Sequence, residues 1–391
     1  MTALTIFCTG FVVISAIYFF IIILVNIGIF RLKRFVRLAD LPMTTVSIII
    51  PARNEEENID HCLRDLERQD YLPGLVEVVV VNDHSTDLTE ERVSGFAQSH
   101  PSMNLRLILI GATGNDQAFK KRSIWSGVDA SSGDLIITTD ADTRLNPGWI
   151  SSIIDFYERQ HPKMIIGPVV FHEETSFFER LQSMEFFGLM AATAGSCNMG
   201  FPLMCNGANL AFERKAYLET RDSEDDLRYP SGDDLFLMMK IRKKYGAKSV
   251  KYLFAEEAIV STKAKKTLRE FFSQRLRWVS KSRGYTDRIV MAVAILTYLF
   301  NFLLMTTLVA GIFSLRLLFF SLFLLGIKMI LELPAVCRIM ALSGKTNLWY
   351  LYPVTQVLNL IYVSLVGLLG NVVSYEWKGR KISPVKRNIR E

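Results

Sequence analysis

Two acidic side chains stand two positions apart directly after a short apolar run. The run is Leu135–Thr139, and Asp140 and Asp142 follow it with one alanine between them. Two carboxylates this close on an extended segment repel each other unless a cation lies between them. Their hard oxygen atoms suit Mg²⁺ or Mn²⁺. The pair therefore predicts a site for a divalent metal.

Two more polar clusters follow apolar runs in the same way. The sequence PARNEEEN, residues 51–58, follows Val46–Ile50, and NDHSTD, residues 82–87, follows Val76–Val81. Taken alone, the first cluster is more typical of an acid-rich helix start, and the second of a turn before a capped helix. Parallel strands, however, end at one edge of a sheet, where ligands bind. We therefore expect the three clusters to converge on one crevice.

The elements that must position these residues alternate between strands and helices. Apolar runs, rich in β-branched residues, predict buried strands at 46–50, 76–81, 105–110 and 135–139. Between the first two, Glu55–Gln69 carries apolar residues at helical spacing. Strand, helix and strand in succession predict βαβ units and an α/β fold with a mostly parallel sheet.

The chain lacks the glycine-rich motifs of two common nucleotide-binding classes. Neither G-x-x-x-x-G-K-[ST] nor G-x-G-x-x-G follows the first strand, which argues against a P-loop NTPase and a dinucleotide oxidoreductase. The cysteines and histidines show no zinc-ligand spacing, so a zinc hydrolase is not expected. The remaining interpretation is a nucleoside diphosphate held through a divalent metal.

A later pair of acids begins a predicted helix. Residues 232–246 start with Gly-Asp-Asp, in which the acids are Asp233 and Asp234. Acids at this place also balance the helix dipole, as do the basic residues at the other end of the segment. The pair is therefore a candidate for chemistry only in combination with the other clusters.

The segment 267–281 has an amphipathic pattern with one apolar and one basic face. This pattern is typical of a helix that lies on anionic lipid. Within the segment, Gln274, Arg277 and Trp278 are three and four positions apart and share one face of the helix. We expect this face to close over the crevice.

The composition indicates a membrane protein. Of the 391 residues, 50% are hydrophobic and 21% are charged, and the apolar excess lies at both ends of the chain. The formal net charge is +6. Lys and Arg flank the apolar runs and do not form a separate face with aromatic residues, so the charge favours a membrane surface and not nucleic acid.

The N-terminal apolar segment is long enough to cross a bilayer. Residues 1–30 carry no charged side chain, and Phe11–Phe30 supplies the roughly 20 residues that a ~30 Å hydrocarbon core requires. A cleaved signal peptide fits less well, because no basic n-region and no A-x-A-like site is present. Basic residues follow at 31–37, and the positive-inside rule then places the next domain in the cytoplasm.

The C-terminal part predicts further spans. Ile289–Cys337 is long enough for two spans and Leu348–Val373 for a third. Three spans place the basic tail outside, whereas the positive-inside rule favours the inside, and the sequence leaves both arrangements open. The expected segments are an anchor over 1–30, a domain over 31–288, a membrane region over 289–377 and a basic tail over 378–391.

Taken in order, the motifs PARNEE, NDHSTD, DAD, GDD and QRLRW resemble the family 2 glycosyltransferases of the GT-A fold. The resemblance is to the membrane-bound branch with a Q-x-x-R-W motif, which includes cellulose, chitin, hyaluronan and poly-N-acetylglucosamine synthases and ceramide glucosyltransferases. It covers roughly residues 46–280. It implies an α/β, Rossmann-like, mixed and mostly parallel sheet in the cytoplasm, with one N-terminal and about three C-terminal transmembrane helices.

The resemblance also implies roles at the nucleotide-sugar donor. Asp83 would bind the base, usually uracil, and Lys120 would be the lysine beside the phosphates. Asp140 and Asp142 would be the D-x-D pair, which contacts the ribose and binds the divalent metal, Mn²⁺ or Mg²⁺. The side of the pocket that holds the nucleoside would be lined by Pro51, Ala52, Arg53 and Glu55.

At the acceptor side, the resemblance implies that Asp234 is the general base. Asp233 stands where the family more often has Glu, so the division of labour between these catalytic acids stays open. The residues implied to hold the diphosphate and the acceptor are Gln274, Arg277, Trp278 and Asn209, the last within the segment 206–209.

The function expected from this resemblance is a membrane-anchored, metal-assisted, inverting glycosyltransferase. It would move a sugar from a nucleotide-sugar, usually a UDP-sugar, to a lipid or a growing glycan at the cytoplasmic face. A polysaccharide synthase typically has more spans, so a glycolipid-forming enzyme is at least as well supported. The alternative class is a non-catalytic membrane scaffold or a partner subunit of a larger synthase, and either class allows an oligomer or an accessory subunit.

Overall fold

The computed structural model describes residues 3–38, 43–111, 119–221, 232–370, 373–377 and 380–382. The predicted basic tail over 378–391 thus lies outside the described residues except at 380–382. The chain forms two compact units that alternate along the sequence. The helical unit comprises Met1–Leu32, Glu174–Leu203 and Ala264–Val373, and the sheet unit comprises Lys33–Glu173, Met204–Lys263 and Ser374–Glu391. The functional division of the chain at residues 30, 288 and 377 stays a prediction.

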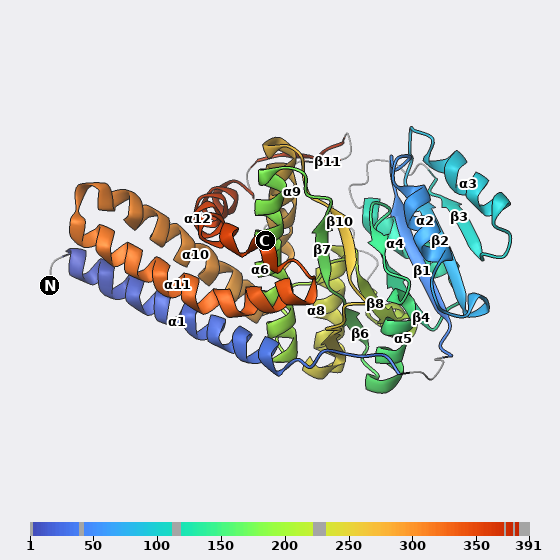
Figure 1. Cartoon of the computed structure of the whole chain (residues 1–391), viewed down its shortest axis with the longest axis horizontal. Helices are drawn as coiled ribbons and strands as arrows, with labels where there is room; N and C mark the ends of the chain where they lie inside the picture. The colour runs from blue at the N-terminus through green and yellow to red at the C-terminus, as the bar shows by residue number, and fades with distance from the viewer. Residues whose placement is uncertain are drawn as a thin grey trace, which may run out of the picture. The chain divides into compact units, whose positions relative to one another are not determined.

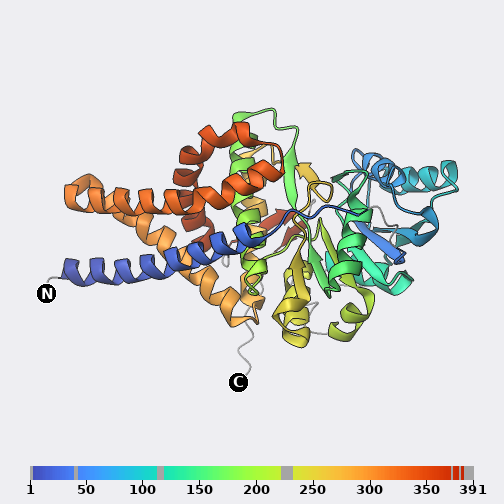
Figure 2. The ribbon, with the colours of Figure 1, turned by 60° about the horizontal axis from the view of Figure 1, so that its bottom comes forward.

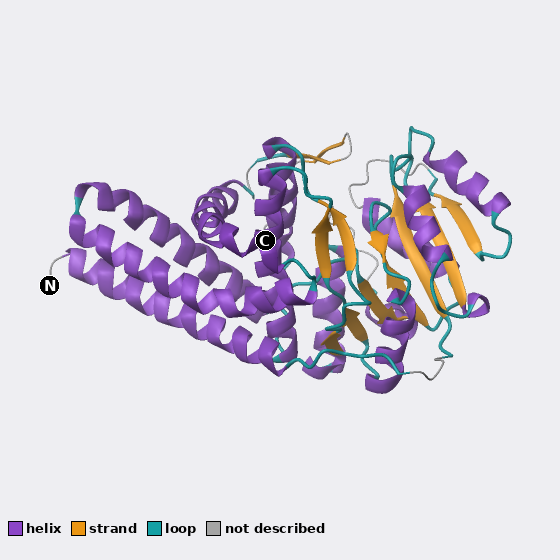
Figure 3. Cartoon of the chain, in the orientation of Figure 1, coloured by secondary structure: helices purple, strands orange, loops and turns teal. Residues whose placement is uncertain are grey.

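The sheet unit is built on a seven-stranded mixed sheet (Figures 1 and 3). The pairs β3–β2, β2–β1, β1–β4 and β6–β9 are parallel, whereas β4–β8 and β8–β6 are antiparallel. This confirms the predicted mixed, mostly parallel sheet. In sheet order the strands are β3 (Leu105–Leu109), β2 (Val76–Asn82), β1 (Val46–Ala52), β4 (Leu135–Thr138), β8 (Leu210–Glu213), β6 (Met164–Ile166) and β9 (Val250–Tyr252).

Helices cover both faces of this sheet, which explains why its central strands are apolar throughout. On one face, Ile48 and Ile50 pack in a buried core with Leu63 of α2 and Trp149 of α5. On the other face, α4 approaches so closely that a Cβ on Gly127 would lie 2.5 Å from the Ile49 side chain. The helices of the sheet unit are α2 (Ile59–Glu67), α3 (Thr89–Ser99), α4 (Phe119–Ala130), α5 (Trp149–Gln160), α7 (Arg214–Thr220) and α8 (Asp233–Tyr245), with 3₁₀ turns η1 (Pro73–Leu75) and η3 (Ala247–Ser249).

Two smaller strand groups complete the sheet unit. A three-stranded sheet has the order β5 (Arg144–Leu145), β10 (Val260–Lys263) and β7 (Val169–His172). Its β10–β5 pair is antiparallel and its β10–β7 pair is parallel. An antiparallel hairpin joins β11 (Tyr375–Trp377) to β12 (Arg380–Ile382).

The helical unit contains four helices that are long and apolar enough to cross a membrane within the described part of the chain. They cover Thr5–Arg31, Arg288–Phe313, Leu315–Leu342 and Thr346–Leu369, which confirms the prediction of one N-terminal and three C-terminal candidate spans. Helix α11 packs against both α1 and α10, whose ribbons lie next to it in Figure 1, and Figure 2 shows the same helices from another direction. The unit comprises α1 (Ala3–Arg31), α6 (Phe177–Asn198), α9 (Leu268–Ser280), α10 (Arg288–Ala310), α11 (Leu315–Leu342) and α12 (Tyr352–Leu369), with 3₁₀ turns η4 (Lys281–Gly284), η5 (Gly311–Phe313) and η6 (Thr346–Leu351).

Helix α6 is apolar on most sides because it packs among the other helices of its unit. Its first turn is closed by a capping box, in which Ser176 and Glu179 satisfy each other's backbone amides. Further along, a Cβ on Gly28 of α1 would lie 2.0 Å from the Gly195 carbonyl oxygen, and a Cβ on Gly195 would lie 2.3 Å from the Val25 carbonyl oxygen. The Asn198 amide donates to the Gly28 carbonyl at 2.8 Å. Small residues thus bring these two backbones together.

Candidate active site

The first two predicted polar clusters lie next to each other at one edge of the sheet. Strand β1 ends at Ala52 and its parallel neighbour β2 ends at Asn82, and these residues are paired in register. The Asp83 amide donates to the Ala52 carbonyl at 2.9 Å. The Arg53 guanidinium donates to the carbonyl oxygens of Asp83 and His84 at 2.7 and 3.0 Å. The structure therefore joins PARNEEEN to NDHSTD through backbone and side-chain hydrogen bonds.

One acidic residue of each of these two loops is buried. Glu55 is 6% exposed, and its carboxylate accepts from the Asn58 amide at 2.9 Å. Asp83 is 4% exposed and lies 3.0 Å from His84 Nδ1. Pro51 lies in β1 opposite Val81. The predicted nucleoside-side residues thus lie together at the ends of β1 and β2, and their contact with a nucleoside stays a prediction.

The D-x-D segment follows β4, the other parallel neighbour of β1. The thiol of Cys62, in α2, lies beneath it and is 3.9 Å from the Asp140 carbonyl. Burial, with smaller contributions from carboxylates that include Asp142 and Glu55, raises the pKa of Cys62 to about 12. Asp142 and Glu55 therefore lie near the same thiol, which brings the third polar cluster to the same edge as the first.

Lys120, in the first turn of α4, is the centre of the candidate site. Its ammonium donates to Asp140 Oδ1 at 2.5 Å. Burial alone would lower the pKa of Lys120, but the negative charges of Asp140, Asp233 and Asp234 outweigh that effect and hold this pKa well above its ordinary value. One lysine thus gathers the D-x-D segment and the Gly-Asp-Asp segment, which are more than 90 positions apart in the sequence.

The two acids of the Gly-Asp-Asp segment begin α8 after Gly232, whose φ of 95° requires a glycine. Asp234 Oδ2 accepts from the Gly207 amide at 3.2 Å, and Oδ1 accepts from the Leu235 amide at 2.7 Å. A Cβ on Gly207 would lie 3.6 Å from both Asp233 Oδ2 and Lys120 Nζ. The missing side chain at position 207 keeps space open among these charged groups.

Asn209 lies two residues further along and is 1% exposed. Its amide group donates to the carbonyl oxygens of Pro168 and Ala258, both at 2.8 Å, and accepts from the Trp149 indole at 3.0 Å. The side chain therefore ties together three segments of the sheet unit. Its contact with an acceptor stays a prediction.

The chemistry of the donor set fits a divalent metal that the protein shares with a nucleotide. Among the described residues, no group of three or more His, Cys, Asp or Glu side chains is arranged to enclose a metal by itself. No hydrogen bond joins the Asp142 carboxylate to another described residue, and Asp140 stands two positions before it. Mg²⁺ and its analogues are commonly held by one or two carboxylates together with substrate phosphates. Asp140 and Asp142 match that arrangement.

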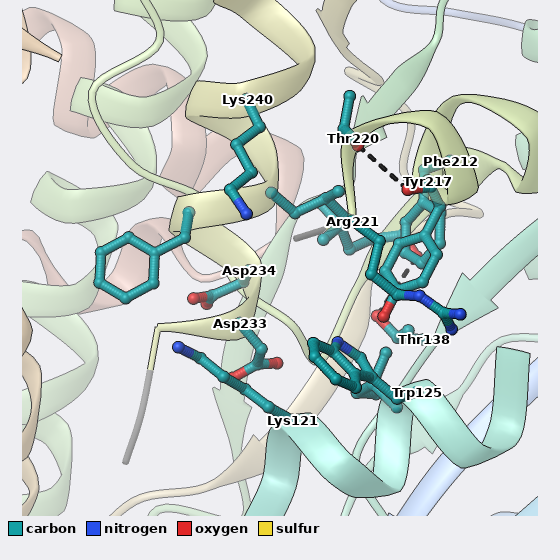
Figure 4. Close-up of a pocket in the computed structure, with 14 residues that line it drawn as sticks. Lys121, Trp125, Thr138, Phe212, Tyr217, Thr220, Arg221, Asp233, Asp234 and Lys240 are labelled. Atoms are coloured by element: carbon teal, nitrogen blue, oxygen red, sulfur yellow. Dashed lines mark hydrogen bonds between the residues drawn. The ribbon is translucent and has the colours of Figure 1, made fainter. Parts of the chain in front are cut away.

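A pocket of about 500 Å³, part of it open to solvent, lies against the Gly-Asp-Asp acids. Figure 4 shows Asp233 and Asp234 on one side, with Trp125 and Arg221 facing them. Sequence reasoning missed the residues of α4 and α7 here, because nothing but the basic run at 120–122 distinguishes these helices from ordinary amphipathic ones. The lining residues are Lys121, Ile124, Trp125, Thr138, Leu210, Phe212, Tyr217, Thr220, Arg221, Asp233, Asp234, Phe236, Leu237 and Lys240.

The Q-x-x-R-W residues lie on α9 in the helical unit. Gln274 Oε1 accepts from Arg275 Nη1 at 2.7 Å. The Trp278 ring centre is 6.4 Å from that of Phe186 on α6. The other predicted site residues belong to the sheet unit. The part that Gln274, Arg277 and Trp278 take at the diphosphate stays a prediction.

Comparisons with known proteins agree with this fold. A family model described as glycosyl transferase family 2 matches residues 47–220, and one described as glycosyl transferase family group 2 matches residues 135–363, more than half of the chain. A mannosyltransferase of Pyrobaculum calidifontis, solved in complex with GDP-Man and Mn²⁺, superposes with a TM-score of 0.57 at 17% identity. This superposition covers 92% of this chain and 97% of that one. It supports the GT-A fold.

Curated relatives have glycosyltransferase names. An N-acetylglucosaminyltransferase of Rhizobium meliloti is 24% identical over 246 residues, which is 61% of this chain and 55% of the relative. An undecaprenyl-phosphate 4-deoxy-4-formamido-L-arabinose transferase of Edwardsiella ictaluri is 28% identical over 151 residues, or 38% and 44% of the two chains. The chain spans about half the length of these relatives or less. With the family models spanning both the sheet edge and the membrane helices, the chain belongs to the family 2 glycosyltransferases.

Proposed function

We propose that this protein transfers a sugar from a nucleotide-sugar, with a UDP-sugar as the first expectation, to a hydroxyl of a lipid-linked or growing glycan acceptor. We further propose that the transfer inverts the anomeric centre and takes place at the cytoplasmic face of a membrane. The single observation that supports this best is the gathering of Asp140, Asp233 and Asp234 around Lys120 at the carboxyl edge of the sheet.

The donor would occupy the edge formed by the ends of β1, β2 and β4. Arg53 fixes the loop of Asp83 through its carbonyl hydrogen bonds, which supports a rigid wall for the base. Lys120 keeps its positive charge throughout the physiological pH range because its pKa is raised. It is therefore a permanent cation beside the place proposed for the diphosphate. A divalent metal on Asp142 and Asp140 would add positive charge there and so favour departure of the nucleoside diphosphate.

The acceptor hydroxyl needs a base, because its pKa lies far above seven. Asp234 is proposed for this task. The Gly207 amide, 3.2 Å from Oδ2, holds the carboxylate in place, and the open position at residue 207 leaves room for a reacting group. The acceptor oxygen would bond to the anomeric carbon as the bond to the diphosphate breaks, and the acceptor proton would pass to Asp234.

The acceptor class is proposed from the membrane helices. Four candidate spans support a membrane-bound substrate, and the relative from Edwardsiella ictaluri is named for an undecaprenyl-phosphate substrate. A glycan acceptor is supported by the name of the relative from Rhizobium meliloti. Membership of the Q-x-x-R-W branch, with Gln274, Arg277 and Trp278 at the diphosphate and acceptor, is part of the proposal.

The test uses the full chain purified in detergent, with Mn²⁺, labelled UDP- and GDP-sugars and total membrane lipid. Label in a small species that organic solvent extracts would support a lipid acceptor, and label in a high-mass product would support a growing glycan. Asp234→Asn should abolish the product, whereas Glu91→Gln, which neutralises an exposed acid on α3, should not. Absence of both transfer and donor hydrolysis with every donor would contradict the proposal and favour a non-catalytic scaffold.

A further inference from the structure

An ion pair lies buried inside the helical unit, between Arg275 of α9 and Glu185 of α6. The two side chains are 3% and 4% exposed. Removing two charges from water costs several kcal/mol per ion, and an apolar pair of similar size is often at least as stable. A buried pair such as this one therefore needs an explanation other than stability.

A third helix closes the pair. The Tyr362 hydroxyl of α12 donates to Glu185 Oε1 at 2.5 Å, and the Arg275 guanidinium occupies Oε2. The Tyr362 ring packs edge-on against Phe271 of α9, with ring centres 5.6 Å apart. Helix α12 packs against both α6 and α9. One carboxylate thus links a candidate membrane span to the helix that carries the Q-x-x-R-W motif.

Arg275 also contacts two residues of that motif. Its Nη1 donates to Gln274 Oε1 at 2.7 Å. Its guanidinium lies over the Trp278 ring at 4.2 Å and over the Phe271 ring at 4.4 Å. The guanidinium is planar and is held by a carboxylate, an amide and two aromatic faces, so its orientation is fixed. It therefore fixes in turn the side chains of Gln274 and Trp278.

We propose that Arg275, Glu185 and Tyr362 are positioning residues for sugar transfer. They hold Gln274 and Trp278 in the orientation in which these side chains engage the diphosphate and the acceptor. This inference rests on the proposed function of the motif and assigns a role to a residue inside it that the motif pattern leaves open. It also gives α12 a task beyond crossing the membrane.

A second buried cluster in the same unit provides the contrast. Glu332 of α11 accepts from Lys328 at 2.8 Å, from Gln356 of α12 at 2.9 Å and from the Tyr18 hydroxyl of α1 at 2.5 Å. This cluster joins α1, α11 and α12 and includes no residue of α9. It has the same chemistry as the Arg275 cluster, a glutamate with a cation and a tyrosine hydroxyl, although Glu332 is 17% exposed and Glu185 only 4%. We assign it to helix packing alone.

The experiment compares Tyr362→Phe with Tyr18→Phe in the full chain. Each change removes one hydroxyl that donates to a glutamate at 2.5 Å, so both variants should lower the thermal midpoint by similar amounts. Only Tyr362→Phe should lower kcat, by roughly 10- to 100-fold, because a small misplacement of an orienting group has effects of this size. It should also raise the ratio of donor hydrolysis to sugar transfer, because the acceptor is no longer held in line.

Arg275→Lys is the second variant. Lysine keeps the charge opposite Glu185 but lacks the planar fork that reaches Gln274 and the flat face that lies on Trp278. It should shift the same ratio in the same direction. Equal ratios in Tyr362→Phe, Tyr18→Phe and wild type, with wild type active, would overturn the positioning role and leave the proposed function intact. A wild-type protein with no transferase and no hydrolase activity would overturn both.

Discussion

The carboxylates at the edge of the sheet and the buried carboxylate of Glu185 in the helical unit are held in different ways. At the sheet edge, Lys120 lies among three carboxylates, and its side chain and that of Asp140 are 18% and 35% exposed. In the helical unit, Glu185 is held by one cation and one tyrosine hydroxyl, at 4% exposure. We expect a shared, partly exposed lysine to be able to exchange a carboxylate for another anion, such as the diphosphate proposed to bind here. A buried ion pair whose hydrogen bonds are all made within the protein has no place for a new partner. Its role is to keep the neighbouring side chains in a fixed orientation.

The largest effect should come from a change among the partly exposed carboxylates around Lys120. Asp234→Asn keeps the size of the side chain and an oxygen for the Gly207 amide, but it removes the proposed base. We expect kcat to fall by about 10²- to 10⁴-fold, the range typical of a lost general base. The thermal midpoint should fall only slightly, because asparagine keeps one of the two accepted hydrogen bonds. The measurement is the initial rate of sugar transfer. A variant that retains more than a tenth of the rate would contradict Asp234 as the base.

A change in the buried ion pair of Arg275 and Glu185 should affect mainly the free energy of unfolding. Arg275→Met leaves Glu185 buried without its cation, which should lower the free energy of unfolding by about 3–5 kcal/mol. The double change Arg275→Met with Glu185→Gln removes both charges and should recover most of that loss, while transfer stays impaired. Unfolding in detergent by heat or denaturant measures the first effect.

The double variant is decisive for the comparison. Recovery of both stability and transfer would mean that the buried pair contributes to folding alone. Recovery of stability without transfer would separate the two roles, because the neutral side chains no longer orient Gln274 and Trp278. Failure of the double variant to recover stability would contradict the view that the cost of the single change is an unpaired buried charge.

Substitutions at two glycines of the sheet unit should distinguish an effect on core packing from an effect on substrate access. A methyl group at Gly127 would meet Ile49 at 2.5 Å, whereas one at Gly207 would meet Asp233 and Lys120 at an ordinary 3.6 Å. Gly127→Ala should therefore lower the free energy of unfolding by about 1–3 kcal/mol, as overpacked cores do. Gly207→Ala should fold normally but raise the KM of donor or acceptor several-fold. Thermal unfolding and steady-state kinetics of both variants check that the first loses stability and the second loses substrate affinity.

The sequence predicted the sheet well because its signals are local. Buried parallel strands require apolar runs on both faces, so β1, β2 and β4 could be recognised without a partner. Polar residues placed at strand ends then converge by topology alone, as the contact between Arg53 and the Asp83 loop demonstrates. The same reasoning predicted the membrane spans, because their length is set by the bilayer.

The sequence could not predict contacts that depend on distant packing. Nothing near Lys120 indicates that α8, more than 110 positions later, would bring Asp233 and Asp234 to its ammonium. In the sequence, Arg275 is one of several basic residues on an amphipathic helix, and its burial against Glu185 depends on where α6 and α12 pack. The basic face of that helix is therefore not entirely a lipid-facing surface, because one of its arginines points inward.

The smallest effect concerns a carboxylate of the sheet unit that resembles those of the helical unit. Burial alone would raise the pKa of Glu77, but hydrogen bonds from the Ser132 and Gly133 amides and the Ser47 and Ser132 hydroxyls outweigh it and lower this pKa. A carboxylate with a lowered folded-state pKa stabilises the fold above its unfolded pKa of about 4.3. That stabilisation is lost as the pH falls through the folded value. Glu77→Gln should therefore lower the thermal midpoint at pH 7 and flatten its decline below about pH 5. If the thermal midpoint of Glu77→Gln fell with acid as steeply as that of the wild type, the hydrogen bonds to buried Glu77 would not contribute pH-dependent stability to this unit.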